Sequence, residues 1–350
     1  MMKKMLAVLL SLALTLGLAA CAAENPPADS SAPPQASAGD DSSEPVHLLS
    51  SPMIFKVATS QSATGIWVPM MEKAYEKITQ LTHGDLQFVI YPNSELGSNI
   101  DCVEQILAGA PMILGCGFDT LTDYSDKFAV ASAPYVFQDS SEVFTLAQSD
   151  WWPAANAELE QEANIKVFAV GSLGYRHFIS TKPIRSVSDI PTMVVRMGSA
   201  LNRDWITVMG GAPTSSTWAD NYASLESGIF DACEATLDLL WTSSLYEVCD
   251  YLTLSGHSIN PNISIMNEDT WNTIPAEYQQ IITEVMEQAM ADMYDEVVAS
   301  EQSFIDQFKE KGVEIIQVDK AEFAAYTGDL LKLEKMDDSI LEEINQILGH

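Results

Sequence analysis

The sequence has little positive charge. Its 350 residues include 17 lysines and arginines against 49 aspartates and glutamates, which gives a formal net charge of −32. Such an acidic chain argues against nucleic acid or anionic lipid as a partner. With 47% hydrophobic and 19% charged residues, the bulk of the chain has a globular composition. Its length fits about two domains.

Beyond its first residues, the chain also lacks an apolar run of the roughly 20 residues that cross a bilayer. The stretch from Leu6 to Leu18 follows Lys3 and Lys4 and is typical of an export signal. It runs into Ala19, Ala20 and Cys21, the pattern of a lipobox. We therefore expect a signal peptide over residues 1–21, lipid modification of Cys21, and an extracytoplasmic protein anchored to the bacterial cell membrane. Ordinary cleavage after Ala20 is the alternative.

Cysteine is scarce in the rest of the chain. Cys102, Cys116, Cys233 and Cys249 show none of the C-x-x-C spacings of metal or redox pairs. Export permits disulfides, so a 102/116 or a 233/249 bridge is possible. Four small buried thiols are the simpler prediction.

The common catalytic motifs are missing as well. The sequence contains no G-x-S-x-G, no P-loop, no G-x-G-x-x-G and no cluster of histidines. His177 lies next to Arg176 and could act as an acid or base, but a hydrogen-bonded structural role is favoured. We expect neither a cofactor nor a metal, and no catalytic residue.

The order of hydrophobic patterns predicts the fold. Residues 22–51 are rich in Pro, Ser, Ala and Asp without apolar periodicity, which predicts a disordered tether. From Phe55 onward, short β runs such as FKVATS, LQFVIYP, IKVFAV and NISIM alternate with helical patterns. This alternation is typical of an α/β fold with largely parallel sheets.

One long helical pattern lies near the end of the chain. Between Pro275 and Gly312 there is no proline or glycine, and apolar pairs recur at helical spacing. An unbroken helix here would be about 54 Å long at 1.5 Å per residue. It would then run along two lobes and brace them. Two shorter helices, broken near Ser300, are the alternative.

All four arginines lie within one short window, at Arg176, Arg185, Arg196 and Arg203. The arginine fork can grip a carboxylate with two hydrogen bonds and stays charged when partly desolvated. Arg185 and Arg203 have polar settings typical of the surface, whereas Arg176 and Arg196 have apolar neighbours. Each of these two could bind an anion or pair with an internal acid. Tryptophans such as Trp67 and Trp218 are core residues or pocket walls.

Several motifs, taken together, resemble the extracytoplasmic solute receptors of tripartite ATP-independent periplasmic (TRAP) transporters, of the dicarboxylate-receptor (DctP) type. The similarity covers about residues 54–325. The motifs are YPNSELGS (91–98), APYVFQD (133–139), GYRHFISTKPIRSVSDI (174–190), VVRMGSALNRDWITVMGGAPT (194–214), SLESGIFDACEA (224–235) and YLTLSGHSINPNISIMN (251–267).

The resemblance implies a two-lobed, periplasmic-binding-protein-like (Venus-flytrap) fold that closes on a ligand in its cleft. It implies lobe I at residues 52–173 plus 262–300 and lobe II at 174–261 plus 301–350. It also implies that Arg196 forms the carboxylate salt bridge and that Arg176 adds a second contact. The remaining ligand-binding candidates are Trp218, Asp220, Tyr222, Glu234 and Trp67.

One residue that departs from the family pattern affects which ligands can be expected. Where the family usually reads D-G-Q-E-N-P, this chain has Ala235 in place of the asparagine that helps to hold the carboxylate or the arginine. The usual substrate classes, such as C4-dicarboxylates and sialic acid, therefore do not carry over directly.

The function implied is that of a receptor without enzymatic activity. It would capture a small carboxylate-containing solute and deliver it to the small and large membrane subunits of an ion-gradient-driven permease. One alternative is an anchored enzyme that uses His177, Asp231 or Glu234 on an organic acid. Another is a receptor that serves an ATP-driven importer.

Overall fold

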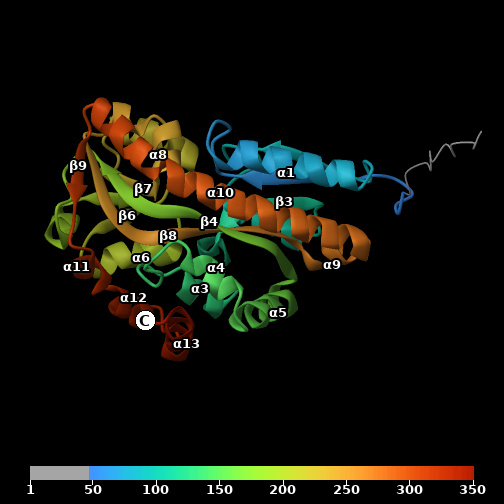
Figure 1. Ribbon diagram of the computed structural model, residues 1–350. Coiled ribbons are helices and arrows are strands. Elements are labelled where there is room, and N and C mark those ends of the chain that lie inside the picture. The colour runs from blue at the N-terminus through green and yellow to red at the C-terminus, as the bar shows by residue number, and fades with distance from the viewer. Residues whose placement is uncertain (1–46) are drawn as a thin grey trace, which may run out of the picture. The chain divides into compact units, whose positions relative to one another are not determined.

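The structure is a computed structural model of the protein and describes residues 47–350 (Figure 1). The predicted signal peptide, Cys21 and most of the predicted tether lie outside these residues. The last part of the tether is described, and it contacts the folded body. Asp85 lies 2.6 Å from His47 Nδ1 and accepts hydrogen bonds from the Leu48 and Leu49 amides. The folded body therefore begins earlier than the predicted boundary at residue 51.

The strands form one sheet. They are β1 (Met53–Thr59), β2 (Leu86–Tyr91), β3 (Met112–Gly117), β4 (Ile165–Ser180), β5 (Val194–Arg196), β6 (Ala212–Thr214), β7 (Ala232–Thr236), β8 (Tyr251–Asn267) and β9 (Glu314–Gln317). Within the described residues the sheet has nine strands in the order β2-β1-β3-β8-β4-β7-β5-β6, and β9 pairs with β8.

Helices cover the sheet. They are α1 (Trp67–Leu81), α2 (Asn99–Leu107), α3 (Asp126–Ala131), α4 (Glu142–Ala147), α5 (Trp151–Ala163), α6 (Ala200–Val208), α7 (Asn221–Glu226), α8 (Leu237–Thr242), α9 (Glu268–Asn272), α10 (Ala276–Glu310), α11 (Lys320–Ala324), α12 (Thr327–Leu333) and α13 (Asp338–Leu348). Short 3-10 helices include η1 (Phe118–Leu121) and η3 (Trp218–Asp220).

The sheet has two halves, each with parallel strands. Lobe I carries β1, β2 and β3, and lobe II carries β5, β6 and β7. The antiparallel strands β4 and β8 run through both halves, since β8 pairs with β9 at its start and with β3 at its end. Figure 1 shows these two strands crossing the length of the molecule. The two-lobed α/β prediction is thus confirmed, and each lobe keeps the expected parallel pairing.

The two crossing strands are longer than the sequence predicted. The short runs IKVFAV and NISIM belong to β4, of 16 residues, and β8, of 17 residues. Gly174, Gly256 and Pro261 lie inside them, where turns would otherwise be expected. The pairing of β4 with β8 accommodates these residues through shifts of register. A bulge of this kind bends a strand without ending it.

The predicted long helix is confirmed as one continuous helix, α10, of 35 residues. Met286, Met290 and Met293 pack into the apolar core around α1 in lobe I. Phe308, near the other end of α10, is buried in the core around α8 in lobe II. The helix therefore joins the cores of both lobes (Figure 1).

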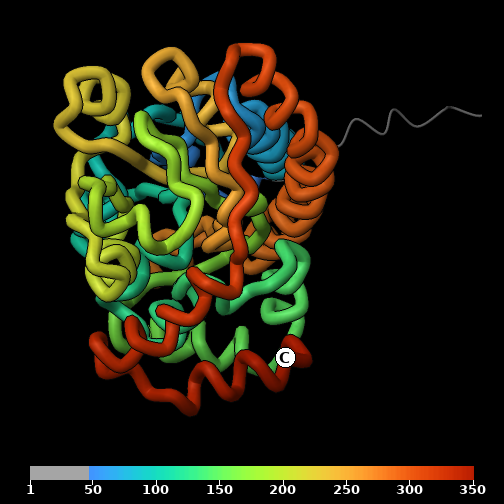
Figure 2. Tube along the Cα trace, turned by 90° about the vertical axis from the view of Figure 1, so that its left-hand side faces the viewer, coloured from blue at the N-terminus to red at the C-terminus, as the bar shows by residue number. Residues whose placement is uncertain are grey.

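The C-terminal segment also contacts both lobes. After β9 it passes along the molecule, and Figure 2 shows it ending beneath the green segments of lobe I. Helix α12 packs on α6, and α13 packs on α3 and α4. The predicted boundaries assign α13 to lobe II, but α13 contacts α3 and α4 of lobe I. The lobe boundaries therefore stay a prediction.

Candidate functional site

Arg196 is the last residue of β5, at the edge of the sheet where parallel strands of lobe II end. Only 7% of its surface is exposed. Its Nη2 donates a hydrogen bond of 2.7 Å to the carbonyl oxygen of Ser216, and its guanidinium carbon lies 5.5 Å from the centre of the Trp218 ring. The carboxyl ends of parallel strands are the usual place for ligand sites in α/β proteins.

The hydrogen-bonding capacity of Arg196 is only partly used. Within residues 47–350, its buried Nε has no partner, and the guanidinium forms no salt bridge. Ala235, where the family has an asparagine, is fully buried in the apolar core of lobe II. A buried arginine with unused donors usually costs free energy unless an acceptor satisfies it. The site is therefore suited to an anion.

Arg176 has a different environment, because its charge is already paired. Its Nε and Nη2 donate to Glu234, with Nη2 3.0 Å from Oε1. The Glu234 side chain is completely buried and also lies 3.4 Å from His257 Nε2. The ion-pair alternative considered for the two arginines thus applies to Arg176, and Glu234 is its counter-charge.

The charges of the site shift one another's pKa values. Burial alone would raise the pKa of Glu234, but the charge and hydrogen bonds of Arg176 together with the interaction with His257 outweigh it and lower that pKa to about 2. Burial lowers the pKa of Arg196, and the Arg176 charge lowers it further against the attraction of Glu234. Burial raises the pKa of Asp119, and Glu234 adds to this effect while both arginines oppose it. Asp119, Arg176, Arg196 and Glu234 thus form one cluster of interacting charges.

A cavity of about 220 Å³ lies at this cluster. Asp119 and Phe118 from lobe I line it together with Asn202 from α6 in lobe II. The remaining walls come from the crossing strands and from the end of α3, through Arg176, Ser258, Ile259, Asn260, Pro261 and Ser132. The cavity is thus formed by both lobes and carries polar groups on most sides.

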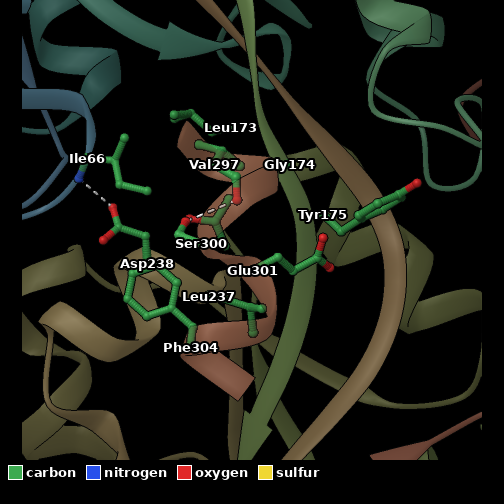
Figure 3. Close-up of a pocket in the computed structure, with 11 residues that line it drawn as sticks. Ile66, Leu173, Gly174, Tyr175, Leu237, Asp238, Val297, Ser300, Glu301 and Phe304 are labelled. Carbon is green, nitrogen blue, oxygen red and sulfur yellow. Dashed lines mark hydrogen bonds between the residues drawn. The ribbon is translucent and has the colours of Figure 1, made fainter. Parts of the chain in front are cut away.

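A second pocket, of about 370 Å³, lies beside α10 (Figure 3). Tyr175 lines it, whereas its neighbour Arg176 lines the first cavity, as expected for successive residues of a strand. Its charged groups are Asp238 and Glu301, and Asp238 accepts a hydrogen bond of 3.0 Å from the Ile66 amide across the lobes. An anion is better suited to the first cavity, because the charged groups that line the second are both acidic.

The other predicted ligand-binding residues are scattered around the cluster. Trp218 stacks near Arg196 and is fixed by a hydrogen bond of 2.9 Å from its Nε1 to Ser243. Asp220 accepts a hydrogen bond from Thr217, and Tyr222 donates one to Glu247, both at exposed positions. Trp67 is fully buried in the core of lobe I. Their roles in ligand binding stay predictions.

The residues considered for an enzymatic role do not form one site. Buried His177 accepts a hydrogen bond from the Gly256 amide, and burial lowers its pKa to about 3. Asp231 lies at the start of β7, where it holds Lys182 at 2.7 Å and the Val194 amide at 2.9 Å. Glu234 pairs with Arg176. The three side chains are thus engaged with different partners.

Asp119, Asn202 and Asn260 were not predicted as site residues. Asp119 had a usable signal, since it follows the buried strand β3 directly and the carboxyl ends of parallel strands meet at one edge. Asn202 precedes Arg203, whose setting is typical of the surface, yet Asn202 is only 3% exposed. Asn260 lies in the part of β8 that the sequence did not predict as a strand.

Three further features of residues 47–350 bear on the function. No group of three or more metal-ligating side chains is present there. No helix in this range is long and apolar enough to cross a membrane. Cys102, Cys116, Cys233 and Cys249 are all buried free thiols.

Known proteins match this chain over most of its length. The sialic acid-binding periplasmic protein SiaP of Vibrio cholerae is 22% identical over 259 residues, which are 73% of this chain and 80% of SiaP. The 2,3-diketo-L-gulonate-binding periplasmic protein YiaO of Escherichia coli is 24% identical over 264 residues, 75% of this chain and 80% of YiaO.

Solved structures match the fold. A TRAP periplasmic solute-binding protein of Actinobacillus succinogenes, with bound L-galactonate, has a TM-score of 0.81 and 26% identity. It covers 85% of this chain, and 99% of its own length is matched. The periplasmic-binding-protein fold is thereby confirmed. The model of "Bacterial extracellular solute-binding protein, family 7" (DctP) matches residues 56–333, so the chain belongs to this family and is an extracytoplasmic solute receptor of the TRAP type.

Proposed function

We propose that this receptor captures a small solute through a carboxylate that binds Arg196 in the cleft between the lobes. It then delivers the solute to the small and large permease subunits of an ion-gradient-driven TRAP transporter. The observation that carries the proposal is the buried Arg196 guanidinium, whose Nε has no hydrogen-bond partner and which forms no salt bridge within residues 47–350. A ligand carboxylate would complete its hydrogen bonds.

The relatives support a carboxylate ligand. Sialic acid, 2,3-diketo-L-gulonate and L-galactonate, named for the three proteins above, are all carboxylic acids. A related structure from Fusobacterium nucleatum holds sn-glycerol-3-phosphate, so the fold also accommodates phosphate esters. The planar arginine fork matches the carboxylate geometry, and one free arginine is enough for one carboxylate.

The two lobes provide a physical basis for capture. Asp119 and Phe118 come from lobe I, and Asn202 and Arg196 from lobe II. A ligand that contacts both sets favours the closed state only by the interactions that it gains there. Capture of this kind requires no chemical step, and we propose that the receptor catalyses none. The lipobox at Leu18 to Cys21 supports lipid anchoring at Cys21 as part of the same proposal.

The test is ligand-induced thermal stabilisation of the protein that begins near residue 47. Organic acids are screened first, and the best acid is then compared between the wild type and Arg196→Ala. At about 100 times the dissociation constant, a bound ligand stabilises the wild type by roughly 2.7 kcal/mol. We expect Arg196→Ala to lose nearly all of this, because the carboxylate loses its charged hydrogen bonds.

Arg185→Ala is the matched control, since it removes the same side chain at an exposed ion pair with Glu314. It should keep the full stabilisation. Equal stabilisation of the wild type and Arg196→Ala would contradict the assignment of the carboxylate to Arg196. A screen in which only phosphate esters stabilise the protein would contradict a carboxylate ligand.

A further inference from the structure

We propose that Asp238 is an interlobe latch that makes closure of the receptor sensitive to pH, because the closed lobes favour the protonated form of this carboxyl. The proposal goes beyond the proposed function, since it concerns the movement of the lobes and not the ligand. It makes Asp238 a positioning residue that acts on the opposite lobe.

The first observation is a direct contact between the lobes. Asp238 lies in the first turn of α8 in lobe II, and its Oδ2 accepts a hydrogen bond of 3.0 Å from the Ile66 amide in lobe I (Figure 3). Within residues 47–350, no other hydrogen bond joins the lobes without the crossing strands, α10 or the C-terminal segment. Separation of the lobes therefore breaks this contact directly.

The start of α1 depends on this contact for a cap. Ile66 is the N-cap residue of α1, and its apolar side chain caps no amide. The amides at a helix N-terminus lack partners within the helix and carry a partial positive charge, so an acceptor stabilises them. Gly65 allows the acceptor to approach, because a Cβ atom there would lie 2.7 Å from Asp238 Oδ2. Lobe I thus supplies the donor and the space, and lobe II supplies the acceptor.

The surroundings of Asp238 favour its neutral form. Burial raises the pKa of Asp238 above its ordinary 3.8, and the Ile66 amide opposes this effect. Burial also raises the pKa of the neighbouring Glu301, although Lys320 opposes it. The titratable groups that face Asp238 in the second pocket and in the groove next to it are Glu301 and Glu296 of α10, Tyr175 of β4, Tyr246 beyond α8 and Lys73 of α1.

Proton binding to Asp238 is therefore linked to closure. Separation of the lobes exposes the carboxyl to water, so its pKa returns toward 3.8 in the open state. A carboxyl whose pKa is higher in the closed state binds its proton more tightly there, so protonation favours closure. This stabilisation is present below the closed-state pKa and is lost as the pH rises through it. The neutral carboxyl keeps a carbonyl oxygen that accepts from the Ile66 amide.

The test measures the distance between the lobes without ligand, in the chain from residue 22 onward. Spin labels are placed at Lys77→Cys in lobe I and at Glu226→Cys in lobe II, two exposed positions. The native cysteines of residues 47–350 are buried and should not react. Distances are compared from about pH 4.5 to about pH 8 for the wild type and for Asp238→Asn, Asp238→Ala and Gly65→Ala. Glu301→Gln, in the same pocket, is the matched control.

We expect the wild type to shift toward the shorter distance as the pH falls, and Glu301→Gln to keep this shift. Asp238→Asn retains an oxygen acceptor but cannot titrate, so its distances should be short and independent of pH. Asp238→Ala loses the hydrogen bond, and Gly65→Ala crowds it from lobe I. In both, the ratio of closed to open protein at the lowest pH should fall by about 5-fold.

A wild type whose distances do not change with pH would overturn the proposal, and this result holds even if a variant fails to fold. A shift that persists in Asp238→Asn, or one that disappears in Glu301→Gln, would also overturn it. Because no ligand is present, these outcomes are independent of the binding of carboxylates to Arg196.

Discussion

Arg176 and Arg196 lie close together but have separate tasks. Arg176 is neutralised by the buried Glu234, whereas the buried Nε of Arg196 has no partner within residues 47–350. A buried ion pair adds little net stability compared with an apolar core, but removal of one partner costs about 3–5 kcal/mol. We infer that the Arg176–Glu234 pair maintains the shape of the site, while Arg196 binds the solute.

The substitution Glu234→Gln tests the structural task. It leaves the Arg176 charge buried without a counter-charge, so the free energy of unfolding at pH 7 should fall by about 3–5 kcal/mol. Because the folded pKa of Glu234 is lowered to about 2 from an ordinary 4.5, the wild type should lose this stabilisation as the pH falls from about 4.5 to about 2. The variant should lack that part of the acid dependence.

Denaturant unfolding at several pH values measures both effects. Glu95→Gln, at an exposed position, is the control and should behave like the wild type. A Glu234→Gln protein as stable as the wild type at pH 7 would show that the pair is dispensable.

At the residue scale, the sequence was sufficient to single out Arg196 and Arg176. Arginine occurs at only four positions, and two of them have apolar neighbours. It did not distinguish the paired arginine from the unpaired one, because the choice depends on where the Glu234 side chain points across β4 and β7. Asp119 was missed because it is far from the arginines in sequence and meets them only through the packing of the two lobes.

At the scale of elements, α10 is the rigid connection between the lobes. Its methionines pack in lobe I and Phe308 packs in lobe II, so its part near Ser300 connects the two lobes alongside β4 and β8. The sequence predicted this helix from a helical apolar repeat without proline or glycine, with a break near Ser300 as the alternative. It did not predict the full length of β4 and β8, because glycine and proline usually indicate the end of a strand. Bulges allow these residues to lie inside β4 and β8.

The substitution Ala299→Pro tests the continuity of α10. Ala299 is exposed, so the change acts on the backbone, where proline removes a hydrogen bond and clashes with the preceding turn at a cost of about 3 kcal/mol. We expect a lower free energy of unfolding and weaker ligand binding, because the lobes lose their common support.

Ala276→Pro is the matched control, since Ala276 is the first residue of α10, where proline is tolerated. It should unfold within about 0.5 kcal/mol of the wild type. Thermal melts and calorimetric titration with the same acid measure both quantities. Normal binding by Ala299→Pro would contradict a bracing role for α10.

At the scale of the whole molecule, an anion receptor with a net charge of −32 must concentrate its positive potential at one place. The fold does this by turning Arg196 and Arg176 inward at the junction of two parallel half-sheets. The α/β layers followed from the alternating patterns, and the two lobes followed from the family resemblance. The sequence did not predict that both lobes share one sheet, because strand order depends on contacts between residues far apart in sequence.

The most direct test of the central claim is a crystal structure of the protein with its best-binding carboxylic acid. The account predicts the carboxylate between the lobes, within about 3 Å of the Arg196 guanidinium. The Arg176–Glu234 pair should be intact. A carboxylate bound elsewhere, with Arg196 still contacting only Ser216 and Trp218, would contradict it.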